Sequence, residues 1–364
     1  MDDSLWRHLP SEIIEHILSL LPVKSLCRFK CVSPKWKSLI SSPEFSKTYL
    51  HINKPQKTIL IDRSSNALYA VDLACANPTA EKLCSFSAEQ FGAWRGRVSP
   101  PCNGLVFVQG FELSVCGLGY DLYTDDYKVV IAIPYFGGAV YSLRTDAWSR
   151  IQISHGLFVE NQFEVYLNNR LHWVCVDRGF HAADFDFSDD GIFKKFQLPD
   201  YVVNNTHMVV LRGCLCLYTD NRHVIRFSVM KEYGVTDSWT KISISDPRAL
   251  IESVLCLSAE DEFVLSMFGK MADVNGEIID ESSTDPDRNH LVLYNPKTET
   301  VRAMIVPGIP TIFLYVGISV ETLISPYHGG GIMRQCEDSS SASSKSYQVY
   351  FQHKNDYVPY FVDQ

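Results

Sequence analysis

Hydrophobic residues in the first fifty positions recur at helical spacing. After Leu9-Pro10-Ser11, where Pro and Ser favour a helix start, apolar residues follow three to four positions apart: Ile13, Ile14, Ile17, Leu18 and Leu21. Pro22 ends this helix and opens a second one with Val23, Leu26, Cys27 and Phe29. Ser33-Pro34 opens a third helix with Trp36, Leu39 and Ile40, and we expect Pro43 to end it. Residues 9–45 are therefore predicted to form three short helices.

A unit of this size has more apolar residues than it can bury by itself. About forty residues rarely form a self-sufficient core. The unit is either a helical cap packed on its own domain, or a docking module whose remaining apolar face meets a partner. The hydrophobic pattern alone leaves both interpretations open.

From about residue 57 the hydrophobic period changes from helical to two, which is typical of strands. A pattern of strand, polar turn and second strand then repeats. Its best copies contain TDAWSRI at 145–151 and TDSWTKI at 236–242, and weaker copies lie at 67–83, 185–196 and 291–302. Trp148, Phe193 and Trp239 are 45 and 46 residues apart.

A period of about 40–50 residues made of strands and turns predicts a β-propeller, with a β-sandwich as the alternative. The chain is thus expected to be mainly β with a small N-terminal α domain. Trp148 and Trp239 should lie in two blades separated by one, with Phe193 in the blade between. Each aromatic residue should enter the core between blades. Gly137-Gly138, Tyr141 and Trp148 also fit one kelch repeat.

Two segments lie off this period. The acidic insertion 272–289 is expected to be a loop, either merely solvated or part of a binding face. A low-complexity segment follows at 336–346. Beyond it, Tyr347–Phe351 and Tyr357–Val362 have strand character and should help to close the ring.

Charge and cysteine content narrow the class of protein. Of the 364 residues, the first fifty carry a net charge of +2 and the remainder carries −11, which argues against a general nucleic-acid binder. Eleven cysteines are scattered without a CxxC pair, as expected for reduced thiols in an intracellular protein. The polar N-terminus predicts no signal peptide, and no apolar run is long enough to predict a membrane span.

The search for catalytic chemistry yields no motif. Asp121, Asp125 and Asp126 cluster in sequence, but a solvated turn is the better interpretation. His172 beside Trp173 is expected to be a core histidine, and Asp273-Val-Asn275-Gly276 fails the calcium-loop pattern. Trp148, Trp173 and Trp239 are expected in blade cores. No catalytic residue, metal site or cofactor is predicted.

The N-terminal string nevertheless resembles a known motif, the F-box of plant F-box proteins. Its positions stand in order from Leu9-Pro10 through Ile17-Leu18, Leu21-Pro22, Leu26, Phe29, Val32 and Trp36 to Phe45, although Pro34 replaces a more usual polar residue. The resemblance implies binding to the Skp adaptor of an SCF (cullin–RING) ubiquitin ligase. The contact residues would be Leu9, Pro10, Ile13, Ile17, Leu21, Pro22, Val23 and Leu26, with Trp36 supporting the fold.

The remainder is similar to the F-box-associated domain of the same proteins. The resemblance rests on Pro101–Val106, Gly119–Val130, Leu171–Trp173, Gly213–Leu217 and Met230–Trp239. It implies an F-box at 1–50 followed by a kelch-like propeller domain at 57–364. Only Phe107 to Cys116 separates the first two segments, where the family has a further strand and an Asn-Pro turn. One blade is therefore expected to lack a hairpin.

The resemblance implies a non-catalytic substrate-recognition subunit of the ligase, in the nucleus or cytoplasm, with an unknown target protein. An adaptor-bound interaction protein acting outside a cullin complex is the first alternative. A propeller enzyme is the second, and it would need His, Asp or Glu residues that converge at the axis. The sequence shows no such set.

Overall fold

The structure is a computed structural model of the 364-residue chain. It describes residues 10–52, 56–85 except 74 and 76, 97–109 except 104, 115–133, 137–151, 164–176, 180–188, 193–199, 202, 206–220, 225–244, 250–269 except 259, 288–320 and 348–351.

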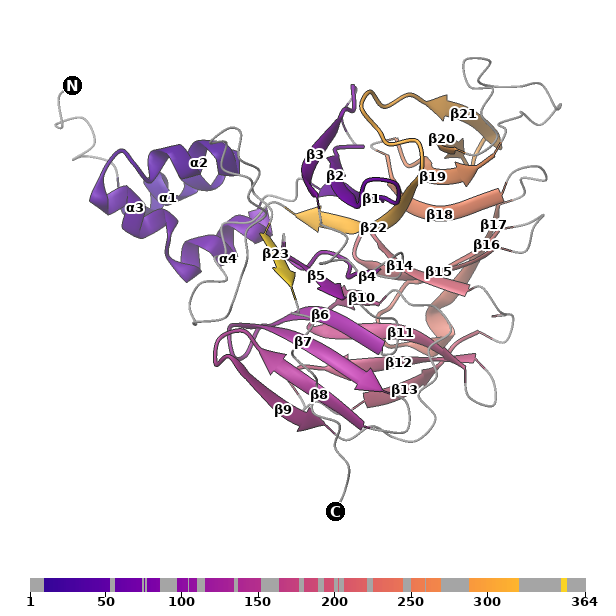
Figure 1. The fold of residues 1–364 in the computed structure, drawn as a ribbon, viewed down its shortest axis with the longest axis horizontal. Coiled ribbons are helices and arrows are strands. Elements are labelled where there is room, and N and C mark those ends of the chain that lie inside the picture. The colour runs from indigo at the N-terminus through magenta and orange to yellow at the C-terminus, as the bar shows by residue number, and fades with distance from the viewer. Residues whose placement is uncertain are drawn as a thin grey trace.

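The N-terminal helices form a separate module, which we call the helical module (Figure 1). It consists of α1 (Ser11–Ser19), α2 (Val23–Phe29), α3 (Pro34–Ile40) and α4 (Pro43–Ile52). The three predicted helices are confirmed. At α3, the Ser33 hydroxyl accepts a hydrogen bond from the Trp36 N–H at 3.2 Å, as the cap-plus-Pro signal predicts.

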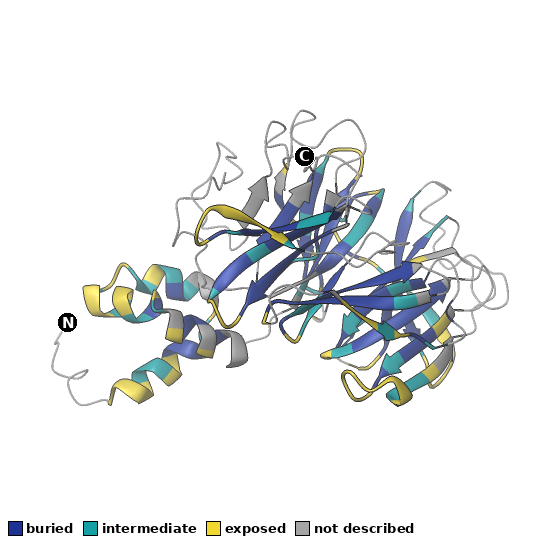
Figure 2. Ribbon diagram, turned by 90° about the horizontal axis from the view of Figure 1, so that it is seen from below, coloured by how far each residue is buried: buried dark blue, intermediate teal, exposed yellow. Residues whose placement is uncertain are grey.

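The third helix ends at Ile40, before Pro43, as expected, but the sequence analysis missed the fourth helix, which Pro43 begins. The Ser42 hydroxyl accepts a hydrogen bond from the Phe45 N–H at 3.1 Å, so Ser42 and Pro43 repeat the start signal of α3. The fourth helix supplies Phe45 and Tyr49 to a core that it shares with Leu18, Leu26 and Ile40. In Figure 2 the exposed surface of this module contrasts with the buried strands of the body.

The body contains five four-stranded antiparallel sheets, which we call blades I to V. Blade I comprises β22 (Phe313–Val320), β1 (Gln56–Asp62), β2 (Ala67–Val71) and β3 (Ala80–Ser85). Blade II comprises β6 (Val115–Asp121), β7 (Asp126–Ile133), β8 (Gly137–Ser142) and β9 (Ala147–Ile151). Blade III comprises β10 (Val165–Leu167), β11 (Arg170–Val176), β12 (Phe180–Asp186) and β13 (Phe193–Gln197).

Blade IV comprises β14 (Thr206–Leu211), β15 (Cys214–Asp220), β16 (Ile225–Met230) and β17 (Trp239–Ile244), with the 3₁₀ turn η2 (Thr236–Ser238) before β17. Blade V comprises β18 (Leu250–Leu257), β19 (Phe263–Phe268), β20 (Asn289–Asn295) and β21 (Thr300–Met304). Neighbouring blades pack face to face around a ring, so the body is a β-propeller and not a β-sandwich (Figure 1). The fold class predicted from the sequence is confirmed.

A sixth sheet, which we call the short sheet, lies between blades I and II in the ring. It contains β4 (Arg97–Val98), β5 (Leu105–Gln109) and β23 (Gln348–Phe351), with β23 parallel to β5. It is the blade expected to lack a hairpin. The ring itself closes through β22, which pairs with β1 from the far end of the chain.

The expectation for the C-terminal strands therefore needs one correction. Ring closure belongs to β22, and the predicted strand at 347–351 instead joins the short sheet as β23. Residues 357–362 lie outside the described residues. The insertion 272–289 does as well, apart from its last two positions.

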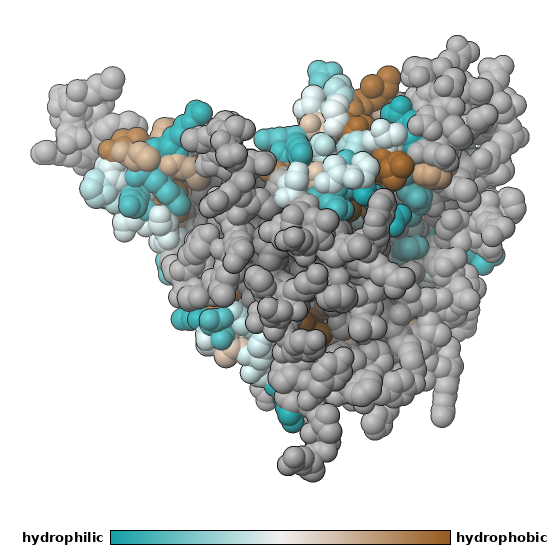
Figure 3. All heavy atoms as spheres, in the orientation of Figure 1, coloured by the Kyte–Doolittle hydropathy of each residue, from teal (hydrophilic) through white to brown (hydrophobic). Residues whose placement is uncertain are grey.

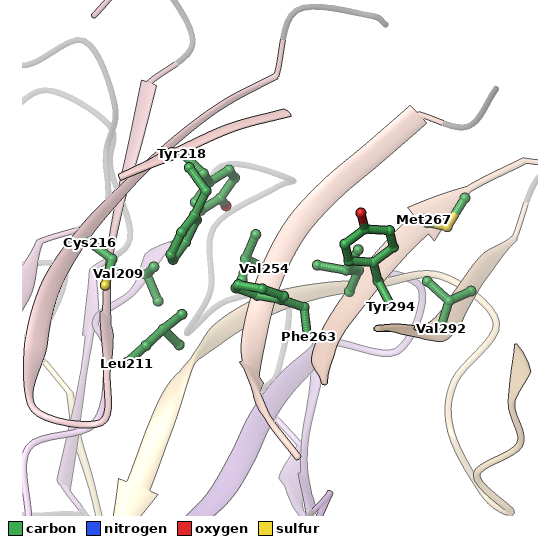
Figure 4. Close-up of a cluster of buried hydrophobic side chains, with 11 residues drawn as sticks. Val209, Leu211, Cys216, Tyr218, Val254, Phe263, Met267, Val292 and Tyr294 are labelled. Carbon is green, nitrogen blue, oxygen red and sulfur yellow. The ribbon is translucent and has the colours of Figure 1, made fainter. Parts of the chain in front are cut away.

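Apolar side chains between adjacent blades form the core. Between blades IV and V, for example, Phe227 packs edge to face on Phe263 with ring centroids 5.1 Å apart. Figure 4 shows Val209 and Tyr218 of blade IV facing Phe263 and Tyr294 of blade V. Each blade thus buries a face only because a neighbour covers it.

The blade positions of the repeated aromatic residues are confirmed. Trp148, Phe193 and Trp239 lie in the fourth strands of blades II, III and IV. The expected burial of Trp148 is wrong, because its side chain is 38% exposed. Trp173, by contrast, is fully buried in the core between blades II and III.

Two hydrogen bonds show which segments share an end of the propeller. Arg63, just after β1, donates its N–H to the carbonyl of Ile312, just before β22, at 3.3 Å. Asn289, at the start of β20, donates its N–H to the carbonyl of Thr311 at 2.9 Å. These segments form one end. The helical module joins at Gln56, the start of β1, and therefore at the opposite end.

Candidate functional site

Helix α1 and the residue that follows it carry more apolar side chains than the core of the helical module buries. Ile14 and Leu21 pack against the module's core, and Leu18 is part of it. Ile13 and Ile17 are each 46% exposed, and Leu20 is 56% exposed. These three residues are spaced at i, i+4 and i+7, so they line one face of the helix beside the core-facing residues.

We call Ile13, Ile17 and Leu20 the apolar stripe. It is exposed in this chain, and apolar atoms gather on the helical module in the space-filling view (Figure 3). Val32, after α2, is a further exposed apolar residue of the module, at 64%. A small module with this much exposed apolar surface has the character of an interface.

The structure places the eight predicted contact residues in three groups. Pro10, Ile13, Ile17 and Pro22 are exposed, and Leu21 is half-buried against the core. The side chains of Leu9 and Val23 lie outside the described residues. Leu26 needs a correction: it has no exposed surface and sits at the centre of the module's core, so it supports the face from behind and does not line it.

Sequence reasoning missed Leu20 and Val32 as surface residues. The helical spacing from Ile13 and Ile17 could have identified Leu20, since i+7 completes the same stripe. Trp36, expected to support the fold, packs edge to face on Phe29 with ring centroids 5.3 Å apart and contacts the core.

The acidic cluster on the propeller is structural. Asp121 is buried and accepts hydrogen bonds from the Tyr123 N–H at 2.9 Å, the Thr124 hydroxyl at 2.6 Å and the Lys128 ammonium at 2.6 Å. Burial favours a higher pKa for Asp121, but the bonds from Lys128, Thr124 and Tyr123 outweigh it and lower the pKa. The carboxylate is ionised and fully engaged in holding its turn.

Asp126 is likewise buried and accepts a hydrogen bond from the Arg144 N–H at 2.8 Å. The prediction of a solvated turn is thus wrong for the carboxylates of Asp121 and Asp126, which are buried, while Asp125 is half-buried. Leu122 and Tyr123 of the same turn are exposed. No catalytic arrangement follows from this cluster.

His172 is a core histidine, as predicted. Its side chain is 1% exposed, and its two ring nitrogens contact the Val165 carbonyl at 3.3 Å and the Tyr233 hydroxyl at 2.8 Å. Burial lowers the pKa of His172 to about 4, although the Val165 carbonyl opposes this shift. The imidazole is therefore neutral near pH 7 and joins blade III to the turn of blade IV.

Arg170 forms the densest ionic cluster in the described part of the propeller. Its guanidinium contacts Asp184 and Asp186 at 2.5 Å each. Burial raises the pKa of Asp184, and the bond from Arg170 opposes that increase. The two carboxylates clamp the cation at the end of a hairpin, which is a structural arrangement.

Within the described residues, no group of three or more His, Cys, Asp or Glu side chains could hold a metal ion. No helix in that part of the chain is long and apolar enough to cross a membrane. The apolar stripe of the helical module therefore remains as the candidate site.

Comparisons with known proteins bear on the same module. Residues 6–48 match the F-box domain family. F-box protein CPR1 of Arabidopsis thaliana is 26% identical over 308 residues, which cover 66% of this chain and 74% of that protein. F-box/kelch-repeat protein At3g23880 of the same plant is 28% identical over 289 residues, covering 65% and 79%. F-box protein At3g07870 is 26% identical over 394 aligned positions, covering 84% and 89%.

Among solved structures, the β-propeller domain of Cps50 (Swd1) covers 71% of this chain and 88% of its own, at 11% identity and a TM-score of 0.36, which is too low to support a functional comparison. The N-terminal helical module is thus an F-box domain, and a β-propeller follows it in the chain. The chain is similar to F-box proteins of Arabidopsis thaliana.

Proposed function

We propose that this protein is the substrate-recognition subunit of an SCF-type ubiquitin ligase. The F-box docks on a Skp-family adaptor, and the propeller binds a target protein for ubiquitination. The protein acts inside the cell, in the nucleus or cytoplasm, and has no catalytic residue of its own. The exposed apolar stripe on a module that matches the F-box domain is the observation that carries this proposal.

The stripe is suited to docking because its burial is favourable. Covering a half-exposed Ile or Leu side chain contributes about 1 kcal/mol or more, at roughly 25 cal/mol per Å² of apolar surface. Pro10 and Pro22, also exposed, flank α1 and extend the same apolar contact. Behind the stripe, Leu18 and Leu26 are fully buried, so α1 rests on a packed support.

Ubiquitination then follows from proximity. A scaffold that holds a target lysine near a charged ubiquitin-conjugating enzyme raises their effective concentration, and no nucleophile is needed on the scaffold. Only residues 53–55 separate Ile52 of α4 from Gln56 of β1. A connection of this length limits how far the propeller can move from the adaptor.

Two surfaces are candidates for binding the target protein, and they lie at opposite ends of the propeller. Leu122 and Tyr123 are exposed on the turn after the inner strand β6, at the end where the helical module joins. The acidic insertion leads into Asn289 at the other end. The insertion's charge would favour a basic partner and a salt-sensitive complex.

The adaptor contact is tested by pull-down with the full chain. An Ile13→Asp, Ile17→Asp double variant should bind a Skp adaptor at least about tenfold more weakly, a loss of about 1.4 kcal/mol or more. Ile305→Asp, at a propeller residue that is 80% exposed, is the matched control and should bind normally. A Leu9→Ala, Pro10→Ala variant should also lose the adaptor while the propeller stays folded. Normal binding by the double Asp variant would reject the docking assignment.

Probing the same pull-down for cullin separates the proposal from its first alternative. An adaptor-bound protein that acts outside the ligase retains the Skp adaptor and lacks cullin. For the second alternative, a propeller enzyme, the carboxylates of Asp121 and Asp184 and the imidazole of His172 are already bound to structural partners.

The insertion is tested by replacing residues 272–286 with a short Gly-Ser linker. This keeps Arg288, whose carbonyl accepts the Gly269 N–H at 3.1 Å and so closes the base of the loop. Loss of co-purifying proteins would identify the insertion as the segment that binds the target protein. If the replacement leaves the co-purifying proteins unchanged and a Leu122→Asp, Tyr123→Asp double variant changes them, the target protein binds at the other end of the propeller.

A further inference from the structure

Exposed apolar side chains of the propeller gather on two turns. In the described part of the propeller, the large apolar side chains that are exposed are Leu122, Tyr123, Trp148, Tyr233, Val235 and Ile305. Four of them, which we call the turn face, lie on the β6–β7 and β16–β17 turns: Leu122, Tyr123, Tyr233 and Val235. Single exposed apolar residues are common on protein surfaces, but a group of them is typical of a binding surface.

Both turns lie at the same end of the propeller. In a four-stranded antiparallel sheet, the first and third connections lie at one end and the second lies at the other. The β6–β7 turn is the first connection of blade II, and the β16–β17 turn is the third connection of blade IV. Since the blades of a propeller are arranged alike around its axis, both turns lie at the end where the helical module joins. Ile305, directly after the fourth strand of blade V, lies at the opposite end.

Blade III connects the two turns. On one side, the Leu122 N–H donates a hydrogen bond to the side-chain oxygen of Asn169 at 2.9 Å, and Asn169 precedes Arg170. On the other side, the Tyr233 hydroxyl contacts a ring nitrogen of His172 at 2.8 Å. Burial raises the pKa of Tyr233 to about 12, and the nearby charge of Arg170 opposes this increase. The turn face therefore borders one surface that runs across blades II, III and IV.

Hydrogen bonds fix the shape of both turns. The Tyr123 N–H donates to the buried carboxylate of Asp121 at 2.9 Å. In the other turn, the Ser238 hydroxyl accepts a hydrogen bond from the Glu232 N–H at 3.1 Å and donates one to the Val235 carbonyl at 2.7 Å. A surface that is already ordered loses less conformational entropy when it binds a partner, and exposed tyrosine is a frequent anchor in interfaces.

Acidic side chains outnumber basic ones around the turn face. The acidic residues in these turns and in the adjoining strand ends of blades II to IV are Asp121, Asp125, Asp126, Asp146, Asp184, Asp186, Glu232 and Asp237. The basic residues there are Lys128, Arg144, Arg170 and Lys231. Glu232 and Asp237 are exposed on either side of Val235. A surface of this charge favours a basic partner and repels an acidic one.

We propose that the turn face binds a segment of the target protein in which large apolar side chains stand beside lysine or arginine. This inference rests on the proposed function, because it names the surface and the class of target that the propeller would bind. The apolar side chains of the segment cover Tyr123 and Val235, and its cations lie near Glu232 and Asp237. Binding at this end also holds the target on the side of the propeller where the F-box joins.

The test uses a random peptide library displayed on phage and selected against the full chain. Enriched peptides should combine large apolar residues with lysine or arginine. An enriched peptide, made synthetically, is then titrated against variants of each turn. Val235→Ser and the double variant Leu122→Ser, Tyr123→Ser should each weaken its binding at least about tenfold. Ile305→Ser, at an exposed apolar residue of the opposite end, is the matched control and should bind the peptide normally.

The charge is tested on the same peptide. Replacing its basic residues by Gln should weaken binding at least about threefold, and added salt should weaken the original peptide more than the Gln version. Enrichment of acidic peptides, or equal binding of the two versions, would overturn the basic character of the target.

Three results would overturn the turn face as the binding surface. The library could yield no enriched peptide, or the enriched peptides could bind both turn variants normally. The turn variants could also weaken binding of the Skp adaptor and not of the peptide, which would make these turns an adaptor contact. The proposed function fails separately, through normal adaptor binding by the Ile13→Asp, Ile17→Asp variant, and that outcome leaves the peptide results unchanged.

Discussion

The hydroxyl of Tyr49 donates a hydrogen bond to the carbonyl of Leu21, 3.0 Å away, and so joins the last helix of the F-box to the end of the first. Leu21 follows α1, where backbone carbonyls have no partner within the helix. The bond satisfies one of them from α4, and the buried ring of Tyr49 packs near Phe45. The fourth helix is therefore part of the support for the apolar stripe on α1.

Tyr49→Phe should remove that bond and keep the packing. The expected loss is about 0.5–1.5 kcal/mol of module stability, since the Leu21 carbonyl loses its partner. Hydrogen exchange of the α1 and α4 amides measures it directly in the full chain. Tyr123→Phe, at an exposed propeller residue, is the control and should leave these amides unchanged. Unaltered exchange in Tyr49→Phe would show that the bond is not stabilising.

Leu26 and Ile17 should give opposite results when replaced by Ala. Leu26 is fully buried, so Leu26→Ala should cost about 2–5 kcal/mol of module stability. Ile17 is half-exposed, so Ile17→Ala should leave the fold intact and weaken adaptor binding by about 1 kcal/mol or more. Exchange protection of α1–α4 and adaptor titration separate the two effects. A stable Leu26→Ala protein with weakened binding would instead make Leu26 a contact residue.

The helical module shows what sequence reasoning can and cannot supply. Pro34 and Pro43 carry the same Ser-Pro start signal, but only the first was interpreted as a start. Proline can also mark the end of a helix, so Pro43 alone does not identify the start of α4. The exposure of Ile17 and the burial of Leu26 could not be separated by pattern, since both are apolar at helical spacing and only the packing of α4 distinguishes them.

Trp173→Ala and Trp148→Ala should differ in stability. Trp173 is fully buried between blades II and III, and its loss should cost about 3–5 kcal/mol. Trp148 is 38% exposed, so its replacement should cost clearly less. Urea unfolding of the two variants provides the comparison. Equal losses would mean that Trp148 is buried in solution.

The sequence predicts those features of the propeller that its repeated segments mark. The spacing of Trp148 and Trp239 correctly placed them in the same strand of two blades separated by one. The gap after β5 correctly indicated a blade short of a hairpin. Burial of Trp148 was not predictable from its own repeat, because it depends on the preceding blade. The pairing of β23 with β5 joins segments more than 240 residues apart, and local pattern carries no signal for it.

His172 should make stability depend on pH between about 4 and 6.5. Its folded-state pKa, about 4, is below the value of about 6.5 for an unperturbed histidine, so the unfolded chain binds more protons in this window. Stability from this group is complete above about pH 6.5 and is lost as pH falls towards 4. The loss is on the order of 3 kcal/mol at most.

The comparison with His172→Gln isolates this contribution, because buried Asp184, whose pKa is raised, titrates in both proteins. Unfolding free energies of the two proteins should converge as pH falls from 6.5 to 4. Parallel curves across that window would show that His172 is not buried in the neutral form.

Gly119→Ala should disturb the contact between blades II and III. A Cβ at Gly119 would overlap the ring of Phe187, a buried residue of blade III. Overpacking of this kind typically costs about 1–3 kcal/mol. Gly117 provides the comparison, because its added Cβ would meet the Leu171 side chain at 2.9 Å and the Trp173 ring at 3.1 Å, a smaller overlap than that at Gly119. Urea midpoints should therefore fall more for Gly119→Ala than for Gly117→Ala. The reverse order would mean that Phe187 moves aside freely and that this glycine is not needed for blade packing.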